Sequence, residues 1–298
     1  GLVASLSRPG GNLTGVSIDG GPGLIARRLQ LPLPYAIVAV VLLFLPAQYF
    51  SGAFTHDSFL AQMAATFFAV SAWWALVAWD DDRSTVGAVI IGLLFAAVFL
   101  SWPIWIGPLV LVFVSLALRP APGDAARIKP RLRPLAIGLA PLLVVASIHV
   151  VGRWGWLAIV RTSGAVLEPS LASLGWALPL LAIAGMVIGL GDRRARVTIV
   201  LLLLIGLQAF TLFVIATTRG ADTPYMAFKM VYLAIYPMAV LASVAMASPA
   251  SKNAPLGWIV AAILVVIVAR PALNAPRVIP VVDLDLYAQL TWNLVFGK

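Results

Sequence analysis

The sequence predicts an all-α protein, a polytopic transmembrane helical bundle with about nine spans. Hydrophobic residues make up 62% of the chain and charged residues only 10%, which is more apolar surface than a water-soluble core can bury. The apolar residues are grouped in runs close to the length of about 20 residues that a helix needs to cross a hydrocarbon core. Trp and Tyr lie mostly near the ends of these runs, as in the aromatic belt of a membrane protein.

Short polar loops separate the apolar runs and define the expected spans in chain order. The first run reads LPYAIVAVVLLFLPAQYF, and the third and fourth meet at Ser101-Trp102-Pro103, where proline favours a tight external turn or a re-entrant hairpin. The nine spans are expected at residues 33–50, 58–79, 86–102, 104–118, 135–152, 171–190, 197–217, 227–247 and 257–270.

Basic residues gather in alternate loops and predict the orientation. Arg27 and Arg28 precede the first span, and the loops Arg119–Pro134 and Gly191–Arg196 are rich in arginine. The loop Ser51–Asp57, which lies between Arg28 and the loop Arg119–Pro134, has no Lys or Arg. The positive-inside rule places the basic loops and the N-terminus in the cytoplasm and the C-terminal tail outside. Because the net charge of +9 is spread over such loops, nucleic acid is not an expected partner, whereas membrane lipids are.

The two ends of the chain differ from its centre. Residues 1–32 form a polar, Gly-rich segment, residues 33–270 the transmembrane domain, and residues 271–298 a tail that we expect to be truncated. The stretch GLVASLSRPGGNLTGVS, residues 1–17, resembles a segment of the substrate-binding proteins of ABC transporters. Since no room remains for the rest of such a domain, a foreign or fusion-derived origin is expected for this segment.

The first external loop carries the pair His56 and Asp57 at the start of the second span. A carboxylate beside an imidazole could accept a proton from a sugar hydroxyl or bind a divalent metal ion. The alternative is that Asp57 caps the helix that follows it. With no Cys and two distant His residues, a zinc site is not expected, so the chain has either no cofactor or a divalent metal ion in this loop.

A second external loop, RWGWLAIVRTSGAVLEPS, carries Arg153 and Arg161. The planar guanidinium of arginine suits a phosphate, and the tryptophans of this loop suit a sugar face or a lipid headgroup. The same residues also serve as ordinary interfacial anchors.

A cation stands at the start of the eighth span. Lys229 follows Arg219, Asp222 and Tyr225, and the tyrosines at 225, 232 and 236 share its helical face. A cation within a membrane span predicts a functional site. Lys229 is expected either to bind a lipid-linked phosphate, or to pair with Asp222 or reach the membrane surface as an anchor.

The stretches YMAFKMVYLAIYPMAVLA and FTHDSFLAQMAATFFAVSAWW resemble bacterial multi-span membrane glycosyltransferases of the GT-C superfamily. The resemblance consists of Tyr-x-x-x-Lys opening a late span and of an aromatic, Gln-bearing helix after an external loop. It implies a polyprenyl-phosphate-linked sugar as donor, external catalysis at the bacterial inner (plasma) membrane, and an envelope acceptor. Asp57 is the residue that matches the catalytic base, although the family usually has an acidic pair in a longer loop.

On this resemblance, the donor phosphate is expected to be bound by four cations, and the substrate by three further residues. The cations are Arg153, Arg161, Arg219 and Lys229, and the further residues are His56, Asp222 and Tyr225.

Two other classes remain open, a transporter or lipid flippase and a non-catalytic membrane scaffold subunit. A transporter needs polar groups near the middle of the bilayer and broken helices, and no Asp or Glu falls in the middle of an expected span. The run Asp80-Asp81-Asp82 is expected to be a solvated cytoplasmic turn, because three consecutive carboxylates cannot all converge on one metal ion.

Overall fold

The computed structural model describes residues 21–46, 49, 60–119, 129–152, 168–247 and 254–274. Within these residues every regular element is helical, so the all-α prediction is confirmed. The helices are α2 (Gly21–Arg28), α3 (Leu33–Val41) with η3 (Leu42–Phe44), α5 (Leu60–Asp82), α6 (Thr85–Ser101), η4 (Pro103–Trp105), α7 (Ile106–Leu118), α8 (Lys129–Gly152), α9 (Leu171–Leu174), α10 (Ala177–Gly189), α11 (Arg193–Thr218), α12 (Tyr225–Ala247) and α13 (Ala254–Asn274).

Each expected span overlaps a helix, but the expected nine membrane crossings are not confirmed. Four helices are long and apolar enough to cross a membrane, at Gln62–Asp82, Leu132–His149, Arg193–Thr218 and Tyr225–Ala247. The other apolar helices have 10–17 residues. At a rise of 1.5 Å per residue, a 13-residue helix such as α10 is about 20 Å long, shorter than a hydrocarbon core of about 30 Å.

The expected span 171–190 is divided into two helices. Gly175 has a φ of +74°, a left-handed conformation that glycine adopts without steric cost. It ends α9 after one turn, and α10 begins two residues later.

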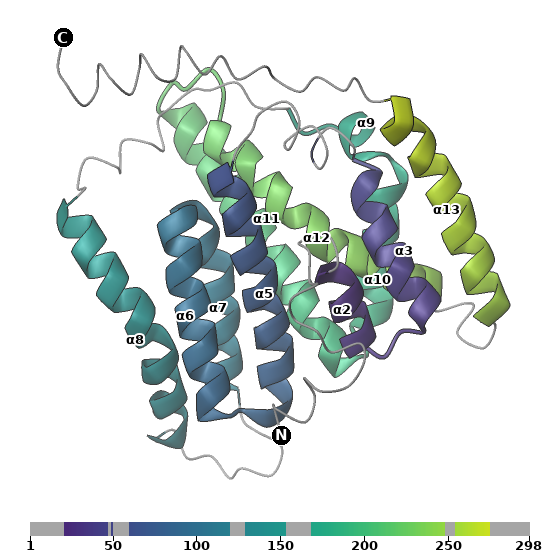
Figure 1. Ribbon diagram of the computed structural model, residues 1–298. Coiled ribbons are helices and arrows are strands. Elements are labelled where there is room, and N and C mark those ends of the chain that lie inside the picture. The colour runs from purple at the N-terminus through teal and green to yellow at the C-terminus, as the bar shows by residue number, and fades with distance from the viewer. Residues whose placement is uncertain are drawn as a thin grey trace, which may run out of the picture.

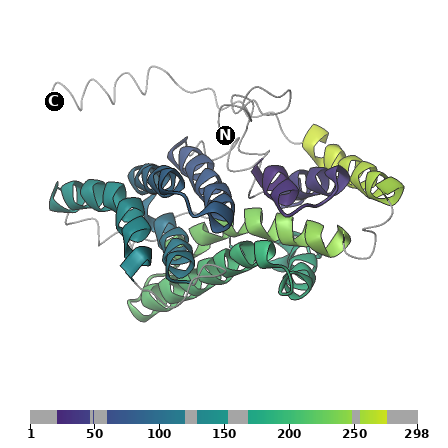
Figure 2. The same cartoon turned by 90° about the horizontal axis from the view of Figure 1, so that it is seen from below.

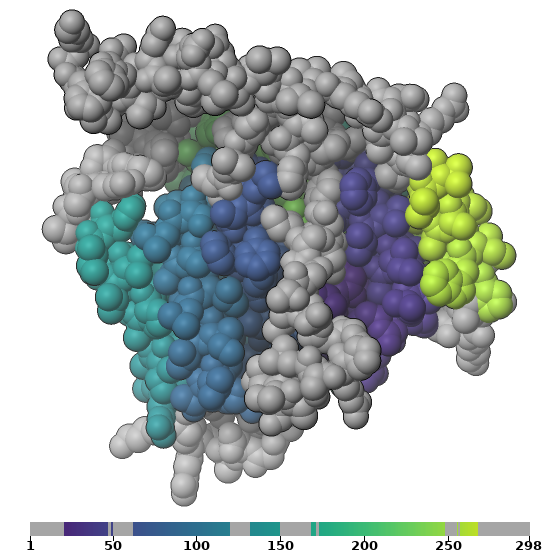
Figure 3. Space-filling model, viewed as in Figure 1, coloured from purple at the N-terminus to yellow at the C-terminus, as the bar shows by residue number. Residues whose placement is uncertain are grey.

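The helices form two groups that a third layer joins. In Figure 1, α5, α6, α7 and α8 stand together on the left, and α3 and α13 stand on the right. The view from below shows α10, α11 and α12 as a layer that runs along both groups (Figure 2). Helices α8, α6 and α5 lie side by side on the face shown in Figure 3.

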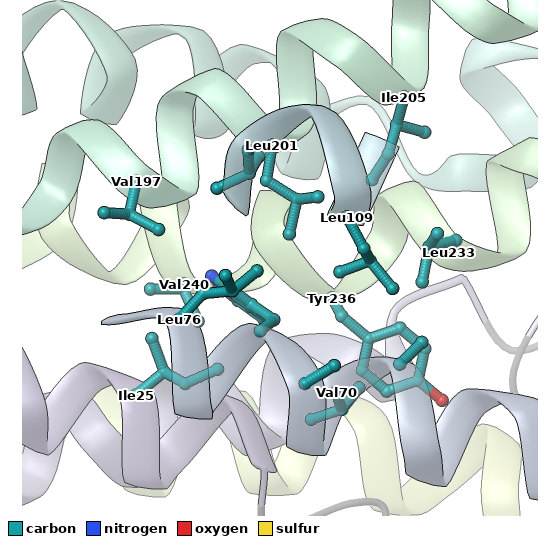
Figure 4. Packing of buried hydrophobic residues seen from close by; sticks show 14 of the residues in the cluster. Ile25, Val70, Leu76, Leu109, Val197, Leu201, Ile205, Leu233, Tyr236 and Val240 are labelled. Atoms are coloured by element: carbon teal, nitrogen blue, oxygen red, sulfur yellow. The ribbon is translucent and has the colours of Figure 1, made fainter. Parts of the chain in front are cut away.

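Helix α12 is the centre of the bundle. It packs against α10, α11, α3 and α2, and most of its residues are buried. Figure 4 shows side chains of α2, α5, α7, α11 and α12 meeting in one core, with Leu76, Leu109, Leu201 and Val240 among them. Functional groups on α12 are therefore held by neighbours on several sides.

Glycine allows two helix pairs to approach closely. A Cβ added at Gly185 of α10 would lie 1.7 Å from the carbonyl oxygen of Leu241 in α12. A Cβ at Gly92 of α6 would lie 2.4 Å from the carbonyl oxygen of Gly138 in α8. Small residues at helix crossings are typical of membrane bundles, where close packing replaces the hydrophobic driving force.

Large apolar side chains cover the outside of several helices. Only 11% of the most apolar stretch of α8 is buried within the protein, and 28% of the most apolar stretch of α11. More than half of the surface of each of these side chains is exposed: Leu143, Val144, Ile148, Leu180, Val187, Leu203, Leu207 and Phe210. Exposed apolar patches of this extent mark a surface that another apolar phase covers, and with the four long helices they favour a membrane-embedded protein.

Candidate functional site

A buried lysine stands in the first turn of α12. Lys229 has no exposed surface, and its Nζ donates to Oε1 of Gln62 on α5 over 3.0 Å. Gln62 itself is 4% exposed. Of the expected alternatives, the structure supports an internal partner, but the partner that it shows is the Gln62 amide and not Asp222. Lys229 does not extend to the surface as a snorkelling anchor.

Tyrosine rings flank the ammonium group. Nζ of Lys229 lies 5.3 Å from the ring centroid of Tyr225 and 4.7 Å from that of Tyr232, both within the range of cation–π attraction. The ring of Tyr49 meets that of Tyr232 edge to face, with centroids 4.9 Å apart. The shared helical face predicted for Tyr225, Lys229 and Tyr232 is therefore confirmed. Tyr236, one turn further along α12, belongs to the buried core that also contains Val70 (Figure 4).

The backbone around Lys229 is tied to the turn between α6 and α7. Nε1 of Trp105, a fully buried side chain, donates to the carbonyl oxygen of Lys229 over 3.2 Å. At the residue before Trp105, the carbonyl oxygen of Ile104 accepts a hydrogen bond from the amide nitrogen of Gln208 on α11. We call Gln62, Trp105, Tyr225, Lys229 and Tyr232 the Lys229 cluster.

The two other described candidates lie at the surface. Arg219 follows the last residue of α11, and its backbone N–H donates to the carbonyl oxygens of Ala216 and Thr217. Both Arg219 and Asp222 are exposed. The structure thus brings Tyr225 and Lys229 together and leaves Arg219 and Asp222 on the turn that leads into their helix.

The four candidates in the external loops lie outside the described residues, so their predicted roles stay predictions. They are His56, Asp57, Arg153 and Arg161. The segment 1–17 also lies outside them.

A second charged centre stands at the opposite end of α5. Asp80 is 3% exposed, so the expected solvated turn is wrong for this residue. Its Oδ1 accepts from Nη2 of Arg83 over 2.7 Å, and its Oδ2 accepts from Nε of Arg193 over 3.4 Å. The burial of Asp80 follows from Arg193, which approaches from α11 and also donates to the Asp80 carbonyl over 3.1 Å. We call Asp80, Arg83 and Arg193 the Asp80 cluster.

The neighbouring carboxylates point to different partners. Asp81 pairs with Arg28 of α2 over 2.8 Å, and Oδ1 of Asp82 accepts from the backbone N–H of Ser84 over 3.1 Å. The three carboxylates therefore diverge, as expected for consecutive residues. Among the described residues no group of three or more His, Cys, Asp or Glu side chains could hold a metal ion.

The Asp80 cluster joins the basic segments at one end of the bundle. Arg83 lies with its guanidinium carbon 4.8 Å from the ring centroid of Trp79 and donates to the carbonyl oxygen of Leu116 in the last turn of α7. Arg28, which pairs with Asp81, and Arg193, which pairs with Asp80, attach the end of α2 and the start of α11 to this end of α5. These contacts are consistent with the expectation that the basic segments lie on the same side of the membrane.

Sequence reasoning recognised Lys229 and Gln62 separately but not as partners. Gln62 was recognised only as the glutamine of the Gln-bearing helix in the resemblance, and neither Trp105 nor Arg193 was a candidate for either cluster. These partners stand far apart in the chain; Gln62 and Lys229 are separated by 167 positions. Comparisons of the chain with protein families, curated proteins and solved structures found no match.

Proposed function

We propose that this chain is the membrane region of a glycosyltransferase that moves a sugar from a polyprenyl-phosphate donor to an envelope acceptor at the external face of the bacterial inner membrane. One observation carries the proposal. The two stretches that resemble GT-C transferases, separated by more than half of the chain, meet at the hydrogen bond from Lys229 to Gln62. The residues that define the resemblance are therefore neighbours in one buried cluster.

The chemistry of the cluster suits a lipid phosphate. An ammonium group buried in a membrane bundle is energetically costly and marks a functional site by default. The Gln62 amide and the two tyrosine rings orient Nζ of Lys229 within the bundle. A phosphate that approached Nζ would gain a charge-assisted interaction in surroundings of low dielectric.

The position of the cluster suits a donor held at the headgroup level. Lys229 lies in the first turn of α12 and Gln62 in the first turn of α5, and both turns follow loops expected outside. Asp57 stands five residues before Gln62 in the chain, and Arg219 stands ten residues before Lys229. The proposed base and one of the proposed phosphate-binding cations, Arg219, therefore belong to the segments that lead into the cluster.

The proposed reaction is a displacement at the anomeric carbon of the donor sugar. Asp57 accepts the proton of an acceptor hydroxyl, and the oxygen forms a bond to that carbon. The bond from the carbon to the phosphate oxygen breaks, and polyprenyl phosphate leaves with its electron pair. Lys229 and Arg219, with Arg153 and Arg161, stabilise the negative charge of the departing phosphate.

Binding of polyprenyl phosphate to the full chain in nanodiscs tests the site. Wild type should bind saturably, and Lys229→Met should weaken binding about 10- to 100-fold, as expected for loss of one charge-assisted hydrogen bond. Arg219→Gln should weaken it less, because Arg219 is exposed. Thr211→Val is the control, since this hydroxyl donates to the carbonyl of Leu207 in its own helix. Absence of binding, or binding indifferent to Lys229→Met in a variant that elutes as a monodisperse species, contradicts the site.

Transfer of labelled sugar from a polyprenyl-phosphate donor tests the activity separately. Asp57→Asn should abolish transfer and leave binding of polyprenyl phosphate intact, because the base acts only on the acceptor. Binding without any transfer would favour a flippase or a scaffold subunit.

A further inference from the structure

We propose that the end of the bundle that contains the Asp80 cluster binds the headgroups of anionic phospholipids through Arg119, Arg133 and Arg194. These residues lie at the end of α7, near the start of α8 and at the start of α11. The inference does not depend on the proposed glycosyltransferase activity, because it concerns the opposite end of the molecule from Lys229.

The three arginines belong to one end of the bundle. The contact of Arg83 with the Leu116 carbonyl brings the end of α7 to the Asp80 cluster, and Arg193 does the same for the start of α11. Helix α8 runs parallel to α6. A Cβ at Gly138 would lie 3.2 Å from the Ala88 carbonyl oxygen, and later in both helices the ring of His149 meets that of Phe99. The start of α8 therefore lies beside the start of α6.

The acidic side chains described at this end are already engaged. Asp80 and Asp81 pair with arginines, and Asp82 accepts from the Ser84 backbone. Asp192 caps α11 by accepting from the backbone N–H of Arg194 over 2.9 Å. Basic side chains outnumber these four carboxylates: Arg27, Arg28, Arg83, Arg119, Arg133, Arg193, Arg194 and Arg196. An excess of positive charge is left at this end.

Arg119, Arg133 and Arg194 carry that excess without an internal role. Arg28, Arg83 and Arg193 hold carboxylates, and Arg196 donates to the Leu190 carbonyl over 3.1 Å. Within the part of the chain that the structure describes, the guanidinium groups of Arg119, Arg133 and Arg194 make no hydrogen bond or ion pair. Each is at least partly exposed, so each presents its donors to an external anion.

An exposed leucine accompanies each of these arginines. Leu118 precedes Arg119 and is 48% exposed, and Leu132 precedes Arg133 and is 50% exposed. Leu190, four residues before Arg194, is 57% exposed. A phospholipid needs this combination, because its phosphate meets the arginine while its acyl chains meet the apolar side chain beside it.

The same pairing argues against a water-soluble anion. A nucleic acid or an acidic peptide would be attracted by the charge, but it would leave the adjacent leucines in contact with water. The apolar surface continues away from these ends along α8 and α11, where Leu143 and Leu203 are 59% and 55% exposed. The arginines therefore mark a border between a charged end and an apolar belt.

Lipid binding to the full chain in detergent tests the inference, with native mass spectrometry counting the bound lipids. The probes are phosphatidylglycerol and phosphatidylcholine of the same acyl length. Wild type should bind phosphatidylglycerol roughly 100-fold more tightly. Because each basic residue near an anionic surface contributes about fivefold to binding, the triple variant Arg119→Gln, Arg133→Gln, Arg194→Gln should weaken phosphatidylglycerol binding by roughly 100-fold. Phosphatidylcholine binding should not change.

The matched control replaces the same three arginines by lysine, which keeps the charge and should retain phosphatidylglycerol binding within about threefold if charge is the determinant. It also separates loss of binding from loss of folding, since both triple variants alter the same positions. Equal affinity for the two lipids in wild type would overturn the inference, and so would an undiminished preference in the glutamine variant. Displacement of phosphatidylglycerol by equimolar inorganic phosphate would also overturn it, because it would show that the site recognises free phosphate.

Discussion

A buried charged side chain lies at each end of α5: Asp80 of α5 itself at one end, and Lys229 of α12 at the other. The partners of the two charges differ. At one end the Asp80 carboxylate receives two guanidinium groups, one on each oxygen. At the other end the Lys229 ammonium meets the Gln62 amide oxygen and two tyrosine rings. Opposite charges neutralise Asp80 within the protein, whereas the described contacts of Lys229 are an amide oxygen and two aromatic rings, which orient its ammonium group. The Asp80 cluster joins α5 to α11 through Arg193, and on the proposed function the Lys229 cluster receives a ligand.

The largest effect is expected when Asp80 is replaced by Asn. The substitution keeps the shape of the side chain but leaves Arg83 and Arg193 without the charge that compensates them. Breaking a buried pair typically costs 3–5 kcal/mol, and since Arg193 is 39% exposed, we expect a loss of about 3 kcal/mol in the free energy of unfolding. Denaturant unfolding of the full chain in detergent measures it.

The control for that substitution is Asp82→Asn, two residues away. Asp82 is exposed, and its carboxylate accepts only from the Ser84 backbone among its described contacts. Its loss should change the free energy of unfolding by less than about 1 kcal/mol. Equal effects at Asp80 and Asp82 would show that the Asp80 cluster does not join the helices.

A smaller loss is expected when Gln62 is replaced by Leu. The substitution removes an acceptor from the Lys229 ammonium, and hydrogen bonds to charged groups contribute about 1.5–3 kcal/mol. We expect the free energy of unfolding to fall by about 2 kcal/mol. A double-mutant cycle with Lys229→Met isolates the coupling between the two side chains.

The matched control is Thr66→Val, one turn along α5. The Thr66 hydroxyl donates to the Gln62 carbonyl of its own helix over 2.8 Å, so it joins no second helix. Its loss should cost at most about 1 kcal/mol. If the cycle gives no coupling between Gln62 and Lys229, the two stretches that carry the resemblance are not joined energetically, and the contact between them does not support a site.

Composition and run length were sufficient to predict the helices but not where they end or how many cross the membrane. Apolar runs determine helices through local hydrophobicity, so every expected span overlaps one. Helix α2 was missed, because GPGLIARR is short and contains two Gly and one Pro. It forms because Ile25 and Ala26 are fully buried in the bundle, and burial of this kind is decided by tertiary packing.

The candidate site could likewise be predicted from the sequence only in part. Lys229 could be recognised because a cation in an apolar helix is exceptional, and the spacing of its tyrosines predicted one face. The burial of Asp80 could not be predicted, because Arg193, the side chain that encloses it, stands 113 residues later in the chain. Local sequence identifies an unusual residue, whereas its partner depends on how helices cross.

The smallest loss in the free energy of unfolding is expected for Arg28→Gln. This substitution tests whether burial, and not merely the presence of an ion pair, determines how much a charged side chain stabilises the fold. Arg28 and Asp81 lie 2.8 Å apart, a shorter distance than that between Arg193 and Asp80, but their side chains are 40% and 38% exposed. Exposed ion pairs contribute about 0.2–1 kcal/mol, and salt screens them. We therefore expect a loss below about 0.5 kcal/mol that disappears in 1 M salt, measured in the same unfolding assay. A loss as large as that of Asp80→Asn would mean that distance, and not burial, determines the strength of these pairs. The comparison between the Asp80 and Lys229 clusters, which assumes that burial strengthens charge interactions, would then have no physical basis.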